Sequence, residues 1–242
     1  MIKALTIFII GILSLSFSAS QAQENEQLLG HMLWKGIGGK TKWDSTNYML
    51  FTAEGSNTHG IQKGRKFLID TKLGRVRFEG KSSEGSNVIA LFNYKTNTLA
   101  KLAINGETTA IDQPKAKTLF EQINAQFKND ISFLFLPALI EQADTKTGEI
   151  SSKIVHAEKL QALPFQLHNG MAGEVLFNGE TGWIKQFTDQ KGNCYMVNDY
   201  KDIGDGLFLP TTFKNLNDQN KNLIFSTVAA FTDMEESRFT KI

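Results

Sequence analysis

Short segments in which apolar and polar residues alternate occupy most of the chain, and they predict β-strands. The clearest is 75–79, Arg-Val-Arg-Phe-Glu, whose alternate side chains would face the core of an antiparallel sheet. Turn residues such as Asn105-Gly106 and Asn178-Gly179 separate the segments closely, which favours a meander over strand–helix–strand units. We predict about eleven strands in two groups, at 47–53, 66–70, 75–80, 88–94 and 98–105, then at 153–160, 174–178, 182–188, 194–200, 207–214 and 223–231.

Two segments have a helical period instead. The first, 24–37, is predicted to be an amphipathic helix from one stripe of apolar residues: Leu28, Leu29, Met32, Leu33 and Ile37. Gly38 and Gly39 follow and end it. The second, 116–140, is amphipathic in its first half and apolar on nearly every side in its second half, where Pro137 must kink or end a helix. We therefore predict an α+β fold with an N-terminal helix and a helical insert over the inner face of the sheet.

The first residues predict a cleaved signal peptide. Lys3 precedes an apolar run at 4–13, and Ser20-Gln21-Ala22 supplies small residues for cleavage before Gln23. The alternative is a membrane anchor, but a spanning helix needs about 20 apolar residues and this run is shorter. We predict a signal peptide at 1–22, a single domain at 23–242, and a periplasmic or secreted protein. The chain has one cysteine, Cys194, so no cysteine follows the apolar run to carry a lipid.

Charge and cysteine content exclude some classes of protein. Cleavage would remove Lys3 and no acidic residue, which leaves basic and acidic residues in balance. A neutral chain lacks the concentrated positive field that nucleic acid requires, so we expect no nucleic-acid partner. Cys194 alone cannot form an internal disulfide, and about 220 residues can bury a core without one. We expect a monomer.

The motifs that could carry chemistry are weak. Gly38-Gly39-Lys40-Thr41 is like the end of a phosphate-binding loop, but Trp34 stands where that loop needs glycine, and a helix-ending turn fits better. The acidic triplet 199–205 lacks the spacing of a calcium loop. The four histidines also stand without metal-ligand spacing: His31, His59, His156 and His168. We predict no enzyme, no catalytic residue, no metal and no cofactor.

Phenylalanine is the remaining signal, with 18 in the chain against 4 tyrosines. These rings either form an ordinary core or line a cavity between the sheet and the insert, and the sequence leaves both open. The candidate residues for an apolar ligand-binding cavity and its lid are Phe51, Phe67, Phe78, Phe92, Phe127, Phe133, Phe135 and Trp183.

The order of these features resembles a known group of proteins. The resemblance is carried by Gly38-Gly39 with Trp43, by 133–137, by 175–183 with its Asn-Gly turn, and by 199–210, where a strand and a glycine turn lead to Leu209-Pro210. Over about 26–232, the chain resembles the LolA/LolB-like secreted proteins, the outer-membrane lipoprotein carriers and their relatives. It is more similar to other secreted members of this group than to the carrier itself.

This resemblance implies a strongly bent antiparallel sheet, a half-open β-barrel, whose concave face is covered by helices and can hold acyl chains. The carrier's functional arginine has no matching motif here, where Arg65, Arg75 and Arg77 occupy the corresponding region. We therefore expect a soluble, non-catalytic binder or carrier of lipid-like or acylated ligands. Its contacts with membranes or envelope proteins would be transient. The alternative is an envelope protein-interaction or assembly module with a filled core.

Overall fold

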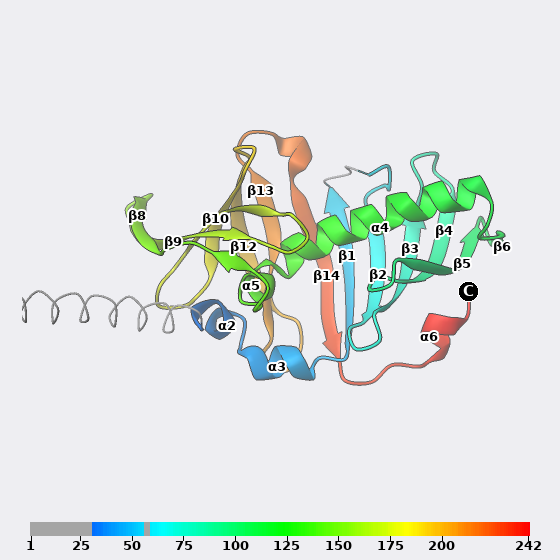
Figure 1. The fold of residues 1–242 in the computed structure, drawn as a ribbon, viewed down its shortest axis with the longest axis horizontal. Coiled ribbons are helices and arrows are strands. Elements are labelled where there is room, and N and C mark those ends of the chain that lie inside the picture. Colours follow the sequence, from blue (N-terminus) through cyan, green and yellow to red (C-terminus); the bar gives the residue numbers. More distant parts are fainter. Residues whose placement is uncertain (1–30, 56–58) are drawn as a thin grey trace, which may run out of the picture.

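Fourteen strands pair antiparallel into one sheet in the part of the chain that the computed structural model describes, residues 31–55 and 59–242 (Figure 1). The signal peptide and the start of the predicted N-terminal helix lie outside these residues. The strands are β1 (Tyr48–Gly55), β2 (Arg65–Asp70), β3 (Arg75–Lys81), β4 (Asn87–Asn93), β5 (Thr98–Ile104), β6 (Glu107–Thr108), β7 (Lys146–Thr147), β8 (Ser151–Val155), β9 (Glu158–Gln166), β10 (Ala172–Phe177), β11 (Ile184–Asp189), β12 (Cys194–Asp202), β13 (Phe208–Asn215) and β14 (Leu223–Phe231).

The strand order explains how the chain is arranged. It runs β6-β5-β4-β3-β2-β1-β14-β13-β12-β11-β10-β9-β7, with β8 also paired to β9. Each half is a meander, and the two halves meet where the first strand, β1, pairs with the last, β14. The sheet does not close on itself, and Figure 1 shows its strands changing direction along the order, so it is open and curved.

Two consecutive helices connect the meanders. Because β6 and β7 lie at opposite ends of the strand order, the chain between them must cross the sheet. It crosses as α4 (Pro114–Leu134), whose 21 residues span about 30 Å, and continues as α5 (Leu136–Ile140). Pro114 occupies the first turn of α4, where its missing N–H costs nothing. Pro137 has no N–H to donate to the carbonyl oxygen of Phe133, and the helix breaks at Phe135, just before it.

The prediction of about eleven strands was too low, because one predicted segment contains two strands and two very short strands were missed. The predicted strand 153–160 is a hairpin of β8 and β9, turned at His156 and Ala157 with φ of 50° and 63°. Such turns usually contain glycine or asparagine, so this one gave no signal in the sequence. The two-residue strands β6 and β7 are too short to show alternation.

From residue 31 onward, two short helices precede the sheet, α2 (Met32–Gly36) and α3 (Lys40–Ser45). Gly38 and Gly39 separate them with φ of 97° and 106°, a backbone region that favours glycine. A Cβ on Gly38 would also lie 2.1 Å from the carbonyl oxygen of Gly206. The glycines thus form the predicted turn, and the helix α3 that follows it was not predicted. The remaining elements are the 3₁₀ turn η1 (Gln219–Lys221) and α6 (Ser237–Thr240).

A buried ion pair joins α4 to the sheet. Arg65 on β2 points to the same face as Phe67, and its Nε and Nη2 donate to the two carboxylate oxygens of Asp130 at 2.5 and 2.8 Å. Both side chains are fully buried. Gln126, one turn earlier on α4, also donates to Asp130 at 2.9 Å, and Arg65 donates to the carbonyl oxygen of Gly55 at 2.8 Å. The pair therefore has hydrogen-bond partners on both sides of the interface.

We predict that Asp130→Ala lowers the free energy of unfolding by about 3–5 kcal/mol, because it leaves the Arg65 guanidinium buried without its counter-ion. The double variant Arg65→Met/Asp130→Leu should recover most of this loss, since it removes both charges. Urea unfolding followed by circular dichroism measures both. The control is Lys153→Ala, which breaks an exposed pair with Glu174 and should cost about 1 kcal/mol or less. The prediction would be contradicted if Asp130→Ala were no less stable than the Lys153→Ala control.

Candidate functional site

Three of the predicted site residues form a row across neighbouring strands. Phe51, Phe67 and Phe78 are paired in register on β1, β2 and β3, all fully buried, with ring centroids 5.1 Å apart at each step. Phe127 on α4 lies over this row, 5.2 Å from Phe67 and 5.6 Å from Phe92 of β4. Alternation along each strand turns these side chains to one face, and the helical period of α4 turns Phe127 toward them.

The last turn of α4 makes a second aromatic contact, on the other half of the sheet. The ring of Phe133 lies 5.2 Å from Tyr195, 5.2 Å from Phe213 and 5.8 Å from Phe187, in edge-to-face arrangements. Phe225 of β14 joins the two halves, because it contacts both Phe51 and Phe213. We call the whole set the aromatic layer: Phe51, Phe67, Phe78, Phe92, Phe127, Phe133, Phe187, Tyr195, Phe213 and Phe225.

The other two predicted residues lie apart from the aromatic layer. Phe135, between α4 and α5, contacts Trp43 of α3 at 5.1 Å. Trp183 is half-buried and stacks on Tyr200 at 4.8 Å, while its Nε1 donates to the carbonyl oxygen of Gly36 at 2.8 Å. Trp183 thus attaches α2 to the sheet.

Several residues of the layer were not among the predicted site residues. Phe187, Phe213 and Phe225 were recognised only as strand residues, and extending the alternation of the first meander to the second would have placed them on the same face. Tyr195 shares that face with Val197 and carried no separate signal. Trp43 was named only among the residues that carry the family resemblance, and its contact with Phe135 depends on α3, which was not predicted.

The aromatic layer offers apolar contact and little else. Most of its ring pairs are edge to face or tilted, and Phe187 stacks on Tyr195 at 5.8 Å, which are favourable geometries for aromatic pairs. Across residues 31–55 and 59–242, no group of three or more His, Cys, Asp or Glu side chains is placed to hold a metal ion. In the same residues, no helix has the length and apolar character needed to cross a membrane. The rings occupy the interface at these positions, so an apolar ligand can lie there only if α4 moves away from the sheet.

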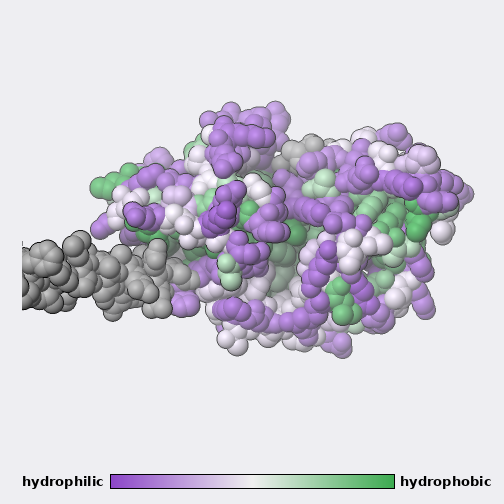
Figure 2. All heavy atoms as spheres, in the orientation of Figure 1, coloured by the Kyte–Doolittle hydropathy of each residue, from purple (hydrophilic) through white to green (hydrophobic). Residues whose placement is uncertain are grey.

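The polar contacts of α4 with its surroundings are local. Asn124 and Lys128 donate to the side-chain oxygen of Asn97 in the β4–β5 turn, at 3.1 and 2.7 Å. Ser132 accepts from Asn169 at 2.7 Å. These contacts and the Arg65–Asp130 ion pair are spaced along α4, and the aromatic rings of the helix lie between them. Figure 2 shows the face that carries α4, where hydrophilic residues cover most of the surface and the hydrophobic areas are small and separate.

A carboxyl group connects α2 to the end of α5. Glu141 accepts from the backbone N–H groups of Leu33 and Trp34, at 2.8 and 3.1 Å, which fills donors that the first turn of α2 leaves open. Burial raises the pKa of the Glu141 carboxyl to about 7, and the two N–H groups oppose that rise. The ring of Trp34 lies 6.2 Å from Trp43, so this carboxyl also fixes the aromatic contacts next to Phe135.

We predict that the Glu141 contribution to stability falls as pH rises from about 4.5 to about 7. In that window the folded protein holds a proton on Glu141 that the unfolded chain has released, so raising the pH favours unfolding. Glu141→Gln keeps an oxygen acceptor for Leu33 and Trp34 but cannot ionise. Its free energy of unfolding relative to wild type should therefore increase across this window, measured by urea unfolding at several pH values. A difference independent of pH would contradict the raised pKa.

Comparisons with known proteins concern the fold. No protein-family model and no curated protein matches the sequence. Among solved structures, the chain is similar to a domain described as an outer membrane lipoprotein-sorting protein from Vibrio parahaemolyticus, with 13% identity, 81% of this chain and 88% of that chain covered, and a TM-score of 0.35. A DUF1329 family protein from Desulfovibrio piger ATCC 29098 is 10% identical, with 90% and 96% covered and a TM-score of 0.41.

MucB is similar over a smaller part of its own length, with 11% identity, 91% of this chain and 62% of MucB covered, and a TM-score of 0.25. These likenesses extend over most of the present chain. They are likenesses of fold.

Proposed function

We propose that this protein is a soluble, non-catalytic periplasmic binder or carrier of acyl chains, which it takes up between α4 and the rings that the sheet contributes to the aromatic layer. The observation that supports this is the continuity of the layer beneath one crossing helix. Phe127 contacts the first half of the sheet and Phe133 contacts the second, with Phe225 between the halves. Moving α4 alone would uncover one long apolar surface.

The free energy gained by burying an acyl chain is of the same size as the free energy lost when α4 leaves the sheet. Each buried methylene contributes about 0.8 kcal/mol, so a chain of about a dozen contributes on the order of 10 kcal/mol. Each aromatic pair that α4 gives up contributes about 0.5–1.5 kcal/mol beyond its buried area. An acyl chain lying on the layer replaces apolar contacts with apolar contacts. Exchange of α4 for a ligand is therefore close to balanced, which suits a protein that must both bind and release.

The Arg65–Asp130 pair would hold the unliganded arrangement. Its two partners come from α4 and β2, so lifting the helix separates them. Buried charges lose hydration, and opening returns hydration as the ion pair breaks, which limits the net cost of separation. The pair thus favours one seated position of α4 without making the interface permanent. The predicted signal peptide at 1–22 supplies the periplasmic location of the proposal.

The alternative function is an envelope protein-interaction or assembly module with a filled core. The contacts within the aromatic layer favour it, because rings 5.1–5.8 Å apart already satisfy one another. Such a module would keep α4 in place and use its outer surfaces. The two functions differ in whether α4 must move.

We predict that the mature protein gains the mass of palmitate in native mass spectrometry, and that fixing α4 prevents this. In a Cys194→Ser background, Asn97→Cys and Lys128→Cys replace side chains in contact at 2.7 Å, and a short bis-maleimide would tie α4 to the β4–β5 turn. The matched control is Lys153→Cys with Glu174→Cys, joined by the same reagent. These two side chains are 2.6 Å apart and lie away from α4.

The control cross-link should leave palmitate binding intact, and the α4 cross-link should remove it. Equal binding in both cross-linked proteins would contradict uptake beneath α4. A clean unliganded mass in every form, with palmitate and with a lipopeptide, would overturn the carrier proposal and support the filled-core module.

A further inference from the structure

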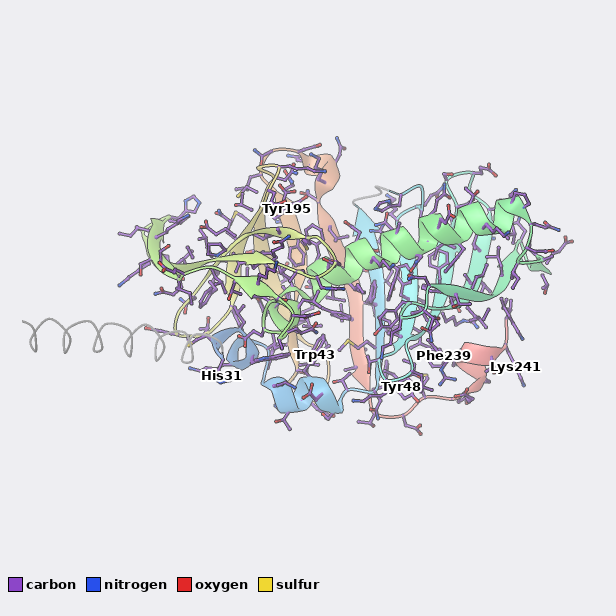
Figure 3. The ribbon with its side chains drawn as sticks, in the orientation of Figure 1. His31, Trp43, Tyr48, Tyr195, Phe239 and Lys241 are labelled. Atoms are coloured by element: carbon purple, nitrogen blue, oxygen red, sulfur yellow. The ribbon has the colours of Figure 1, made fainter. Side chains whose placement is uncertain are left out.

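The last residues of the chain lie on the other face of the sheet. We call residues 232–242 the C-terminal strap. Its Phe239 stacks on Tyr48 with ring centroids 5.9 Å apart, and the Arg75 guanidinium lies 5.0 Å from the Phe239 ring (Figure 3). On β3, Arg75 and Arg77 alternate with Val76 and Phe78, which belong to the core beneath α4. The strap therefore lies on the face opposite α4.

Charged side chains of the sheet hold the strap. Arg75 pairs with Asp70 at 2.6 Å and also with Glu236 of the strap, and these carboxylates raise the pKa of Arg75. Arg77 donates to the carbonyl oxygens of Lys241 and Arg238 at 2.6 and 3.3 Å. Lys101 donates to the carbonyl oxygen of Thr240 at 2.8 Å. Arginine side chains that alternation alone would assign to solvent thus have partners.

A pocket of about 210 Å³ lies between the strap and the sheet. Its apolar lining comes from Leu50 and Leu68, which are paired on β1 and β2, and from Phe231 and Met234 where the chain leaves β14. Its charged lining consists of Lys66, Arg77, Glu79 and Arg238. Phe231 is 36% exposed. The pocket is smaller than the sites of drug-sized ligands, which occupy about 300–1,000 Å³.

The charges of the pocket favour an anion. Three cations face a single carboxylate, Glu79, which already accepts from Arg77 at 2.6 Å and lies 3.4 Å from Lys66. Burial tends to raise the pKa of Glu79, but the hydrogen bond from Arg77 and the charges of Lys66 and Arg77 lower it overall, so this carboxylate stays ionised. The Arg238 side chain is 60% exposed and its Nε lies 3.9 Å from Glu235. A guanidinium carries five N–H donors, so Arg238 can bind a further oxygen anion.

We propose that this pocket binds a medium-chain fatty acid in its carboxylate form. The carboxylate would lie between Lys66 and Arg238, and the alkyl chain would contact Leu50, Leu68 and Met234. The small volume excludes long acyl chains, and the excess positive charge selects the acid over a neutral alcohol. This site is on the opposite face from the aromatic layer, so it is independent of the function proposed above.

Isothermal titration calorimetry of the full mature chain with octanoate, and with 1-octanol as the neutral match, tests this site. Arg238→Gln should weaken octanoate binding about tenfold, the equivalent of one charge-assisted hydrogen bond, and should leave the weaker octanol binding unchanged. Met234→Trp should abolish binding of both by filling the pocket. Lys214→Gln removes the same charge from an exposed position on β13 and should change neither.

Circular dichroism shows whether each variant is folded. If Met234→Trp misfolds, Leu68→Gln takes its place, because it makes the apolar lining of the pocket polar. Octanoate binding should persist in the protein whose α4 is cross-linked to the β4–β5 turn. No binding by the wild type, binding unaffected by Arg238→Gln and by the pocket-filling variant, or loss of binding on cross-linking α4 would each overturn the proposal. Failure of palmitate uptake beneath α4 has no bearing on these outcomes.

Discussion

The pairing of β1 with β14 is the constraint on which the rest of the structure depends. These strands pair over their full lengths, from Tyr48 opposite Phe231 to Gly55 opposite Leu223, with one irregularity after Thr52. With the first and last strands joined in the middle, the chain must move outward to β6, return from β7, and cross the whole sheet between them. A single long helix does this most economically, since its own backbone groups are paired as it crosses an apolar surface.

Helix α4 therefore does two things that conflict. It must bury a face along its whole length, which calls for apolar residues, and it must lie in one position on a surface of similar rings. Aromatic contacts alone are weakly specific, because a ring can find a comparable neighbour after a small shift. The Arg65–Asp130 pair supplies the missing specificity, since its two-point hydrogen bonding is satisfied in one position. A buried pair is weak evidence of added net stability, and we infer that this one mainly fixes the position of α4.

The sequence predicted much of the first meander and of the aromatic layer, because alternation is a local property that survives in any sheet with one buried face. Phe51, Phe67 and Phe78 were found in this way. Other features depend on contacts between distant segments. The turn at His156 and Ala157 contains neither glycine nor asparagine, and α3 is short. The role of Glu141 depends on backbone groups of α2 that are far away in the sequence. Arg75 and Arg77 alternate as solvent-facing residues do, and only the strap shows that they are covered.

The strands β1–β3 thus carry two sets of side chains with different chemistry. One face presents Phe51, Phe67 and Phe78 to α4, and the other presents Leu50, Leu68 and Arg77 to the pocket beneath the strap. The sheet backbone separates the two sets, so a side chain added or removed on one face does not contact the other. Events on the two faces can influence each other only through a change in the twist or register of these strands. Because β1 also pairs with β14, such a change would reach Phe231 at the pocket and Phe225 in the layer together.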